Sequence, residues 1–432
     1  MTYENAIEYL YNSIPMFQKV GAVAYKEGLH TTEVLDEHFG HPHKNYKIIH
    51  VAGTNGKGSC SHTLAAILQS AGYRVGLYTS PHLLTFRERI RVNGKCIDER
   101  YVADFVESER SFWECLHPSF FELTTALAFK YFSDQKVDVA VVEVGLGGRL
   151  DCTNIVNPII SVITNISFDH TQFLGDTLPK IAKEKAGIMK SNVPVVIGEA
   201  NEQTRPVFEN RAKDLGCKLF FAEDDKEVES CEMKEYGGLA YQTKHFGIID
   251  GELGGVYQEK NSNTVLCAIR ELQRIGLEVD AESIRRGFSG VVELTGLLGR
   301  WQKVRTSPTV VCDTGHNVGG WEYLGKQLRM QKCRKMRIVF GMVSDKDVNT
   351  VMAMLPTDAI YYFTKAKTQR AINENEVLKI GHAIGLNAKS FSNVADAYNA
   401  ALADSDNDDF VFVGGSSYIV ADFLACLRGD NQ

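Results

Sequence analysis

A glycine-rich segment near residue 53 has the composition of a phosphate-binding loop. Glycines let backbone N–H groups approach phosphate oxygens closely, a lysine adds positive charge, and a serine hydroxyl can reach Mg²⁺. The strict Walker spacing is not met, because Gly58 separates Lys57 from Ser59 and Val51 stands at the expected first glycine. We predict phosphate binding; the alternative is a strand-to-helix turn that holds no ligand. The segment reads Gly53-Thr54-Asn55-Gly56-Lys57-Gly58-Ser59.

The elements on either side must present this loop at the edge of a sheet. Residues 47–52 (KIIHVA) predict a strand, and residues 57–71 predict an amphipathic helix. Residues 137–144 (VDVAVVEV) are almost wholly apolar, as in a central parallel strand that is buried on both faces. Strand-like runs alternate with helical patterns along most of the chain. This alternation indicates βαβ units, a parallel sheet and helices on its faces.

The alternation predicts two α/β domains. We expect an N-terminal P-loop ATPase domain with a parallel sheet over residues 1–292 and a smaller, Rossmann-like C-terminal domain over 307–432, joined by a linker over 293–306. Residues 291–306 show little helical periodicity, which suits a connection. Residues 217–255 carry charge clusters and short alternating stretches, so we expect a small antiparallel excursion there.

Composition and charge disfavour several classes of function. The chain has 432 residues, of which 44% are apolar and 23% charged, as in an ordinary soluble globular protein. Its 47 basic and 54 acidic residues leave a net charge of −7, which disfavours a general nucleic-acid binder. No apolar stretch reaches the roughly 18 residues of a membrane span, and the N-terminus lacks a secretory pattern. Ten scattered cysteines without a C-x-x-C pair predict reduced thiols in the cytoplasm.

Two oxygen donors follow predicted strands and are candidate magnesium ligands. Glu143 lies at the C-terminal end of residues 137–144, the edge at which open α/β sheets bind ligands. A carboxylate there is seldom needed for packing, although a helix cap or a surface position is the alternative. Ser80 ends the neighbouring strand and could ligate the same ion, or only form the turn before Pro81. Mg²⁺ prefers oxygen ligands, so the pair suits ATP chemistry.

Further motifs, in a fixed order, make the chain resemble one enzyme family. The loop is similar to that of the Mur ligase superfamily, and nearly the whole chain resembles the folylpolyglutamate synthase/dihydrofolate synthase family. Cell-wall Mur ligases usually carry a nucleotide-sugar domain before the loop, whereas only about fifty residues precede Gly53 here. The matching segments are Thr79-Ser80-Pro81-His82-Leu83, Ser119-Phe120-Phe121-Glu122, residues 143–154, Asp169-His170, Glu184-Lys185-Ala186-Gly187-Ile188, Gly299-Arg300, Asp313-Thr314-Gly315-His316-Asn317 and Asp345-Lys346-Asp347.

The resemblance implies roles for metal and phosphate ligands. Ser80 and Glu143 would hold a first Mg²⁺, and His170 would hold a second beside the γ-phosphate. Lys185 would be carbamylated, which turns a cation into an anionic oxygen donor. On the residues alone, Lys185 looks like an exposed helix charge. The phosphates would be held by Lys57, Arg300 and His316.

The resemblance also implies nucleotide and substrate contacts. Asn261 would contact adenine, although Tyr257 replaces a family histidine in this segment. Asp313 would bind ribose hydroxyls, and Ser416, which opens the last helix, would help to bind glutamate. An aromatic pair such as Phe120 and Phe121 is more often part of the core than a site that stacks on a ring. The candidate pterin contacts are Phe120, Phe121, Glu122, Leu150, Asp151, Cys152 and residues 24–29.

The resemblance therefore implies an ATP-dependent amide-bond ligase that acts on small molecules. ATP would phosphorylate a carboxylate of dihydropteroate or of a reduced folate, and the amine of L-glutamate would then displace phosphate. We expect both activities, a monomer, and no nucleic-acid or membrane partner. The alternatives are a monofunctional folylpolyglutamate synthase, another ligase of the superfamily, a P-loop NTPase switch or kinase, and a nucleotide-binding protein without catalysis.

Overall fold

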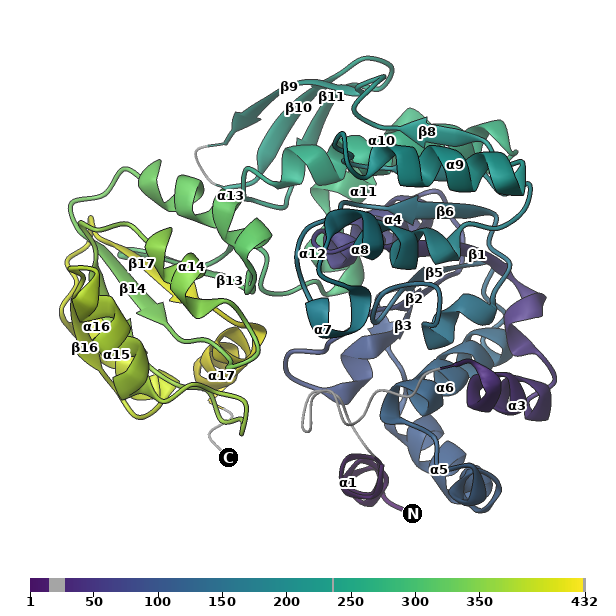
Figure 1. The fold of residues 1–432 in the computed structure, drawn as a ribbon, viewed down its shortest axis with the longest axis horizontal. Helices are drawn as coiled ribbons and strands as arrows, with labels where there is room; N and C mark the ends of the chain where they lie inside the picture. The colour runs from purple at the N-terminus through teal and green to yellow at the C-terminus, as the bar shows by residue number, and fades with distance from the viewer. Residues whose placement is uncertain (15–27, 235–236, 430–432) are drawn as a thin grey trace. The chain divides into compact units, whose positions relative to one another are not determined.

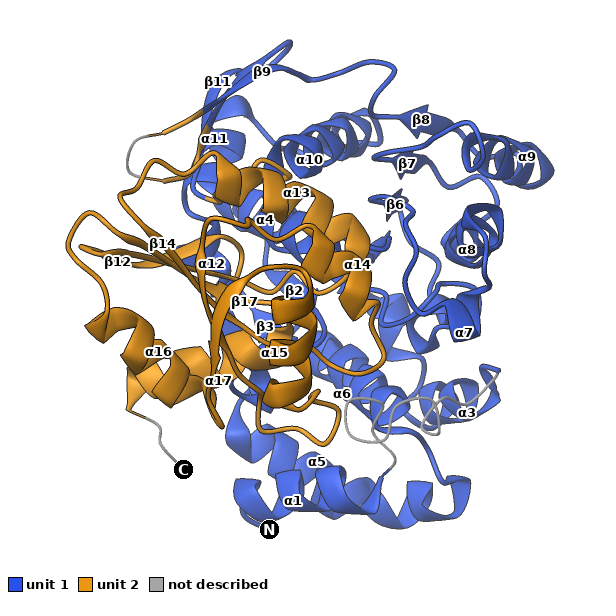
Figure 2. Ribbon diagram, turned by 60° about the vertical axis from the view of Figure 1, so that its left-hand side comes forward, with its two compact units in different colours: residues 1–232, 240–252, 258–297 blue, residues 233–239, 253–257, 298–432 orange. Residues whose placement is uncertain are grey.

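The computed structural model describes residues 1–14, 28–234 and 237–429, and its helices and strands alternate along most of the chain (Figure 1). Its contacts divide the chain into two compact units (Figure 2). The first unit comprises residues 1–232, 240–252 and 258–297, and the second comprises residues 233–239, 253–257 and 298–432. Both units are α/β, so the predicted fold class is confirmed.

The first unit is built on an eight-stranded sheet. Its strands are β1 (Lys47–Ala52), β2 (Val75–Tyr78), β3 (Ile90–Val92), β4 (Lys95–Cys96), β5 (Val139–Glu143), β6 (Ile160–Ile163), β7 (Val195–Ile197) and β8 (Leu219–Phe221). Their order is β4-β3-β2-β5-β1-β6-β7-β8. The pairs from β2 to β8 are parallel, and β3 and β4 add an antiparallel edge. β5 is buried along its whole length, as predicted for a central strand.

Helices cover both faces of this sheet (Figure 2). On one face, α4 (Lys57–Ser70) packs against β1, β2 and β5, and α10 (Gln258–Arg274) packs against α4, β6 and β7. The other face carries α6 (Phe120–Asp134), α8 (Leu178–Lys185) and α9 (Arg205–Leu215). The remaining helices are α1 (Tyr3–Ser13), α3 (His30–His38), α5 (Glu99–Trp113), α7 (Thr171–Leu174), α11 (Ala281–Ser289) and α12 (Val291–Thr295), with 3₁₀ turns at Pro42–Asn45, Phe86–Arg89, Glu114–Leu116, Cys152–Ile155 and Ala186–Ile188.

The small antiparallel segment expected over residues 217–255 is shorter than predicted. It consists of β9 (Val228–Met233), β10 (Leu239–Thr243) and β11 (Gly247–Gly251), in the order β11-β10-β9. Their short connections fit an antiparallel meander. The prediction was wrong at its start, because β8 pairs in parallel with β7 and belongs to the main sheet. Three residues are too few to show the apolar pattern that distinguishes a strand in the main sheet.

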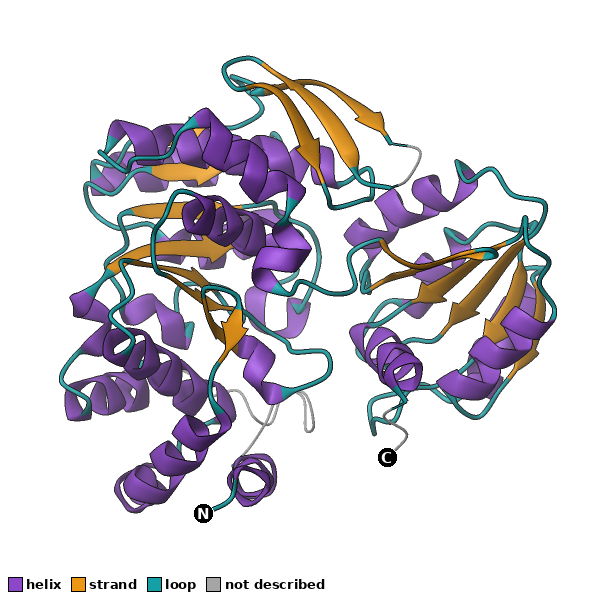
Figure 3. Cartoon of the chain, turned by 180° about the vertical axis from the view of Figure 1, so that it is seen from behind, coloured by secondary structure: helices purple, strands orange, loops and turns teal. Residues whose placement is uncertain are grey.

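The second unit is built on a six-stranded sheet with helices on both faces (Figure 3). Its strands are β12 (Gln302–Thr306), β13 (Thr309–Asp313), β14 (Met336–Phe340), β15 (Ile360–Phe363), β16 (Asn387–Ser390) and β17 (Phe410–Gly414). The order is β12-β13-β17-β14-β15-β16, in which only the β12–β13 pair is antiparallel. The helices are α13 (Val318–Arg329), α14 (Val348–Ala353), α15 (Glu374–Ala383), α16 (Val394–Ala403) and α17 (Ser417–Arg428).

The segment expected to be a connection has structure of its own. Residues 291–306 contain α12 and β12. α12 has only five residues, and β12 is a partly exposed edge strand, so neither produces a clear periodic pattern. Among the described residues, none of the helices has the length and apolar character that crossing a bilayer requires.

Candidate functional site

The candidate ligands of the first unit lie at one edge of its sheet. β2, β5, β1 and β6 are parallel neighbours, so their carboxyl ends meet at the same edge. Glu143 is the last residue of β5, pairs in register with Val51 of β1, and is buried. Ser80 follows β2, the phosphate loop follows β1, and His170 follows β6. The order of the strands thus gathers residues that are far apart in the sequence.

Two glycines of the loop are required by close contacts. A Cβ on Gly53 would lie 1.8 Å from Thr164 Oγ1, and a Cβ on Gly56 would lie 2.3 Å from Asn261 Oδ1. Their φ angles of +144° and +83° also disfavour other residues. Lys57 is the first residue of α4, so the loop leads directly into a helix N-terminus. That geometry presents backbone N–H groups and a positive dipole end to an anion.

Residues after β6 hold the loop in shape, and sequence reasoning missed them. The Thr54 N–H donates to the Asn165 carbonyl and the Asn55 N–H donates to Asn165 Oδ1, both at 2.9 Å. The Ser167 N–H donates to Thr54 Oγ1 at 3.0 Å. Two amides of the loop are therefore bonded within the protein, and the N–H groups at the start of α4 are the ones that the loop can offer to an anion. Only the nearby Asp169-His170 motif marks Asn165 and Ser167 in the sequence.

Two lysines converge on one carbonyl of the loop. Lys57 Nζ donates to Gly53 O at 3.0 Å and to Thr54 O at 3.1 Å, and Lys185 Nζ donates to Gly53 O at 2.8 Å. Lys185 is 4% exposed, so the interpretation as an exposed helix charge is wrong. Burial, and then the charge of Lys57, lower the pKa of Lys185 from 10.5 to about 7. Near neutral pH a large fraction of this amine is uncharged.

The donors at this edge fit a divalent cation only in part. Ser80 offers a hydroxyl, Glu143 a carboxylate and His170 an imidazole; the His170 Nε2 lies 3.8 Å from Asp169 Oδ1. Among the described residues, no three His, Cys, Asp or Glu side chains are grouped closely enough to hold a metal ion. Mg²⁺ commonly takes one or two protein carboxylates and completes its shell with phosphates and waters. The donor set therefore suits a magnesium ion that arrives with a nucleotide.

Two polar residues of α10 lie against the phosphate loop. Gln258 Nε2 donates to Ser59 Oγ at 3.2 Å, and Asn261 Nδ2 donates to Gln258 Oε1 at 2.9 Å. Ser59 is 1% exposed, so its hydroxyl faces the protein interior in this structure. Gln258 was missed by sequence reasoning, although it lies three residues before Asn261 in the same segment.

The candidates of the second unit also share a sheet edge. β13, β17 and β14 are parallel neighbours, and Asp313 at the end of β13 is in register with Gly414. His316 Nδ1 lies 3.0 Å from Thr314 O, and because a carbonyl only accepts, Nδ1 carries the proton. Ser416 Oγ accepts the Ile419 N–H at 3.2 Å and so caps α17.

Arg300 lies in a loop that is tied to the end of β13. The carbonyl of Gly299 accepts hydrogen bonds from the Thr314 N–H at 3.0 Å and from Thr314 Oγ1 at 3.2 Å. Burial raises the pKa of Asp313, and the charge of Arg300 opposes that shift. Arg300 and Asp313 are therefore close enough to interact electrostatically within the second unit.

An arginine near the start of α17 was missed by sequence reasoning. Arg370 donates to the Tyr418 hydroxyl at 3.0 Å and to Asp345 Oδ2 at 2.6 Å. It thereby joins the Asp345-Lys346-Asp347 motif to the segment that contains Ser416. No local pattern marks Arg370, because its partners lie 25 and 48 residues away.

The weaker pterin candidates already have structural roles. Phe120 and Glu122 are 3% and 2% exposed, and Glu122 accepts the Ser119 N–H at 2.6 Å in a capping box of α6. Asp151 is also buried and accepts two backbone N–H groups at 2.8 and 3.0 Å. Residues 24–27 lie outside the described residues. The described members of this set with partial exposure are Gly28, Leu29, Phe121, Leu150 and Cys152.

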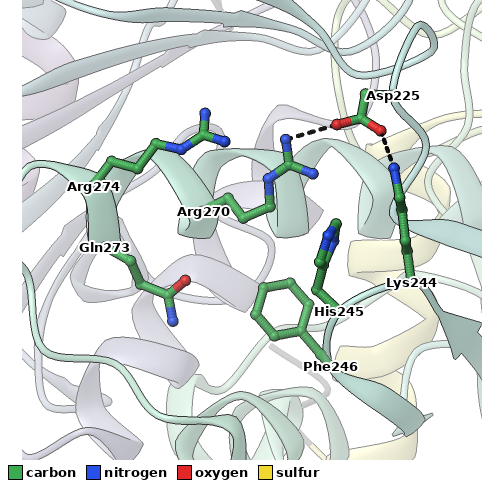
Figure 4. Close-up of a pocket in the computed structure, with 7 residues that line it drawn as sticks. All are labelled: Asp225, Lys244, His245, Phe246, Arg270, Gln273 and Arg274. Atoms are coloured by element: carbon green, nitrogen blue, oxygen red, sulfur yellow. Dashed lines mark hydrogen bonds and ion pairs between the residues drawn. The ribbon is translucent and has the colours of Figure 1, made fainter.

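A separate pocket in the first unit contains none of these candidates (Figure 4). It is lined by Asp225, Lys244, His245, Phe246, Arg270, Gln273 and Arg274. Its cations are paired: Lys244 and Arg270 bond to Asp225, and Arg274 bonds to Glu271. The pairs of Lys244 and Arg270 with Asp225 connect the three-stranded sheet to α10, whereas the Arg274 pair lies within α10.

The chain matches two protein-family descriptions. Residues 51–268 match the Mur ligase middle domain, and residues 299–417 match the Mur ligase glutamate ligase domain. The Escherichia coli (strain K12) protein named dihydrofolate synthase/folylpolyglutamate synthase is 36% identical over 381 residues, which cover 87% of this chain and 86% of that protein. A Haloferax volcanii protein named "probable bifunctional folylpolyglutamate synthase/dihydropteroate synthase" is 33% identical over 98% of this chain, which spans 50% of that protein's length.

Solved structures share the fold over the whole chain. E. coli FolC in complex with DHPP and ADP has a TM-score of 0.84 at 33% identity and covers 100% of this chain and 99% of its own. A bifunctional folylpolyglutamate synthase/dihydrofolate synthase with Mn, AMPPNP and L-glutamate bound has a TM-score of 0.81 at 30% identity and covers 99% of this chain and 98% of its own.

Proposed function

The chain belongs to the dihydrofolate synthase/folylpolyglutamate synthase family of Mur ligases, and we propose that it ligates L-glutamate to dihydropteroate and to reduced folates. It is an ATP-dependent ligase, as its relatives are. The observation that carries the proposal is the first sheet edge, where the phosphate loop, two lysines and Glu143 lie together. A switch or kinase of another class has no need of a glutamate ligase domain at residues 299–417.

The proposed reaction has two steps. A carboxylate oxygen of the folate attacks the γ-phosphorus of ATP, ADP leaves, and an acyl phosphate forms. The uncharged amine of glutamate then attacks the acyl carbon, inorganic phosphate leaves, and the amine loses a proton as the amide forms. Lys57 and the N–H groups at the start of α4 offset the charge on the phosphates, which lowers the barrier to attack by an anion.

Glu143 and Ser80 are proposed as protein ligands of a first Mg²⁺, and His170 as a ligand of a second. When bound, Mg²⁺ neutralises phosphate charge and orients the transferred group. Divalent-metal use is supported by the relative that holds Mn and AMPPNP. The buried carboxylate of Glu143 and the hydroxyl of Ser80 present the oxygen donors that Mg²⁺ prefers.

Lys185 is proposed to be carbamylated on Nζ. An uncharged amine is the form that adds to CO₂, and a pKa of about 7 makes that form abundant at neutral pH. The test compares enzyme purified in CO₂-depleted buffer with the same enzyme after bicarbonate is added. Activity should rise with bicarbonate in the wild type, and the Lys185→Ala variant should not respond. Equal activity of the wild type in both buffers would refute the modification.

Residues of the second unit are proposed to complete the nucleotide and glutamate sites. Arg300 and His316 would contact phosphates, Asp313 would bind ribose, and Ser416 would bind glutamate. Asp313 and His316 lie at or just after the end of β13, and Ser416 follows β17, its parallel neighbour, at an edge of the kind that binds ligands. Arg300 precedes β12, and its loop is tied to the end of β13 through Thr314. Asn261 is proposed to contact adenine, since it borders the phosphate loop.

The acceptor is tested by ligation of labelled glutamate. Purified enzyme with ATP and Mg²⁺ receives dihydropteroate in one reaction and tetrahydrofolate in another, and each product is identified by mass spectrometry. The proposal predicts one added glutamate on dihydropteroate and one or more on tetrahydrofolate. Product from tetrahydrofolate alone would reduce the function to that of a folylpolyglutamate synthase.

We further propose that the enzyme is a cytoplasmic monomer. Its ten cysteines are all unpaired, as suits a reducing compartment. Light scattering of the purified protein gives its mass in solution. The monomer predicts a mass near 48.1 kDa, and a multiple of that value would contradict it.

A further inference from the structure

Three hydrogen bonds hold the Asp313 carboxylate at the end of β13. Its Oδ2 accepts the Tyr257 hydroxyl at 2.5 Å and the Trp301 N–H at 2.7 Å, and its Oδ1 accepts the Gly315 N–H at 2.8 Å. All of these residues belong to the second unit. A tyrosine therefore supplies one of the two donors on Oδ2, where the family resemblance leads one to expect a histidine.

Tyr257 is fixed from both sides. The preceding residue, Val256, donates its N–H to Gln327 Oε1 at 3.0 Å, and Gln327 is fully buried on α13. The Tyr257 ring packs against the core of the second unit, as does Trp301. The hydroxyl consequently has little freedom to leave Asp313, and because an ionised carboxylate only accepts, the phenol must be the donor.

The three hydrogen bonds are distributed unevenly over the two oxygens of the buried Asp313 carboxylate. A carboxylate offers about two acceptor positions on each oxygen. Tyr257 and Trp301 fill those of Oδ2, whereas Gly315 takes one position on Oδ1. The remaining position on Oδ1 can accept a hydroxyl. Without the phenol, the carboxylate is free to turn part of the way about χ2, which moves the Oδ1 acceptor out of position.

We propose that Tyr257 is a positioning residue that aims Asp313 Oδ1 at a ribose hydroxyl of the nucleotide. This inference rests on the proposed ribose role of Asp313. It deepens that role, because it predicts that the enzyme's preference for ribonucleotides over deoxyribonucleotides depends on Tyr257 as well as on Asp313. The phenol itself does not touch the reacting phosphate, so its loss should change KM for ATP far more than kcat.

The test compares ATP with 2′-deoxy-ATP and with 3′-deoxy-ATP. Tyr257→Phe should lower the preference for ATP, measured as a ratio of kcat/KM values, by roughly tenfold, the usual effect of losing a hydrogen bond to a charged group. Asp313→Asn should lower it further, and adding Tyr257→Phe to Asp313→Asn should change nothing more. Tyr257→His, which keeps an N–H donor, should restore part of the preference.

Tyr362→Phe is the matched control. Tyr362 is also buried in the second sheet, and its hydroxyl donates to Asp404 Oδ2 at 2.8 Å, away from β13. The Tyr362→Phe variant should lose about as much stability as Tyr257→Phe and should keep the wild-type preference for ATP over the deoxy analogues. Calorimetric binding of ADP and of 2′-deoxy-ADP and 3′-deoxy-ADP to the same variants gives a readout that needs no turnover.

Two results would overturn the inference. A wild-type preference in Tyr257→Phe, with a lost preference in Asp313→Asn, would show that Asp313 needs no positioning by Tyr257. An unchanged preference in both variants would show that Asp313 does not contact the ribose. Either result leaves glutamate ligation intact, whereas failure of the proposed function would appear as no glutamate-dependent product from the wild type.

Discussion

The Lys185 side-chain nitrogen donates a hydrogen bond to the carbonyl oxygen of Gly53 at 2.8 Å. The contact joins the C-terminal end of α8 to the first residue of the phosphate loop, although 132 positions separate the two residues in the chain. Lys57 donates to the same carbonyl from the other end of the loop. One buried carbonyl thus brings together the residue proposed to bind phosphate and the residue proposed to be modified.

The buried amine of Lys185 predicts a pH dependence of stability. The unfolded chain keeps this proton up to about pH 10.5, whereas the folded protein releases it near pH 7. The folded state then binds fewer protons between these values, so the free energy of unfolding rises with pH, by on the order of 1.4 kcal/mol per pH unit. Urea unfolding in CO₂-depleted buffers at pH 7, 8 and 9 should show this rise relative to Lys185→Met. Parallel pH profiles of the two proteins would contradict it.

Replacing Lys57 with alanine should abolish turnover and leave the fold intact. The side chain bonds to the loop carbonyls, where it is proposed to neutralise phosphate, and it contributes little to the core. We expect turnover to fall by at least about 100-fold, with a wild-type circular dichroism spectrum. Lys213→Ala, on the exposed face of α9, is the control for loss of a positive charge. Near-normal turnover of Lys57→Ala would show that the loop takes no part in the mechanism.

Replacing Glu143 with glutamine should impair catalysis much more than stability. The amide has nearly the shape of the carboxylate but is neutral, and it is therefore a poor magnesium ligand. We expect kcat to fall by at least about 100-fold and the Mg²⁺ concentration needed for half-maximal activity to rise. If Glu143 serves only to end β5, turnover at saturating Mg²⁺ will stay close to that of the wild type.

Removing the buried carboxylate of Glu227 should destabilise the first unit without changing the site. Glu227 is fully buried, bonds to Arg270, and accepts a hydrogen bond from His245 Nδ1 at 3.0 Å. Arg270 also pairs with Asp225, and both residues line the pocket in Figure 4. Glu227→Ala leaves a largely buried guanidinium with one partner fewer, so we expect a loss of about 3–5 kcal/mol of unfolding free energy.

Glu229→Ala is the control for this change, because Glu229 lies on the same strand and is exposed. It should shift the urea midpoint only slightly. Equal midpoints for Glu227→Ala and Glu229→Ala would show that the buried ion pairs add nothing to stability.

Sequence reasoning succeeded where a single local pattern determines a structure. The apolar run of β5, and the strand, glycine-rich loop and helix over residues 47–70, each produce a pattern within one continuous stretch of the chain. Parallel pairing then places Glu143 and the loop at one edge without further information. The short strand β8 was assigned to the wrong sheet, since three residues carry too little periodicity.

What could not be predicted depends on contacts between distant segments. The environment of Lys185 was misjudged, because its burial results from the packing of α8 under the loop and not from its own helix. Asn165 and Gln258 were missed because their hydrogen-bond partners, Asn55 and Ser59, lie more than one hundred residues earlier. The donors on Asp313 likewise come from three different segments.

The release of ADP, measured with and without each of the other two substrates, tests the central claim most directly. The enzyme with ATP and Mg²⁺ is given dihydropteroate, tetrahydrofolate or no acceptor, each with and without L-glutamate. A ligase that proceeds through an acyl phosphate predicts sustained ADP release only when a folate acceptor and glutamate are both present, with one ADP for each glutamate added. Sustained release that is indifferent to both the acceptor and glutamate would contradict the account and indicate an NTPase of another class.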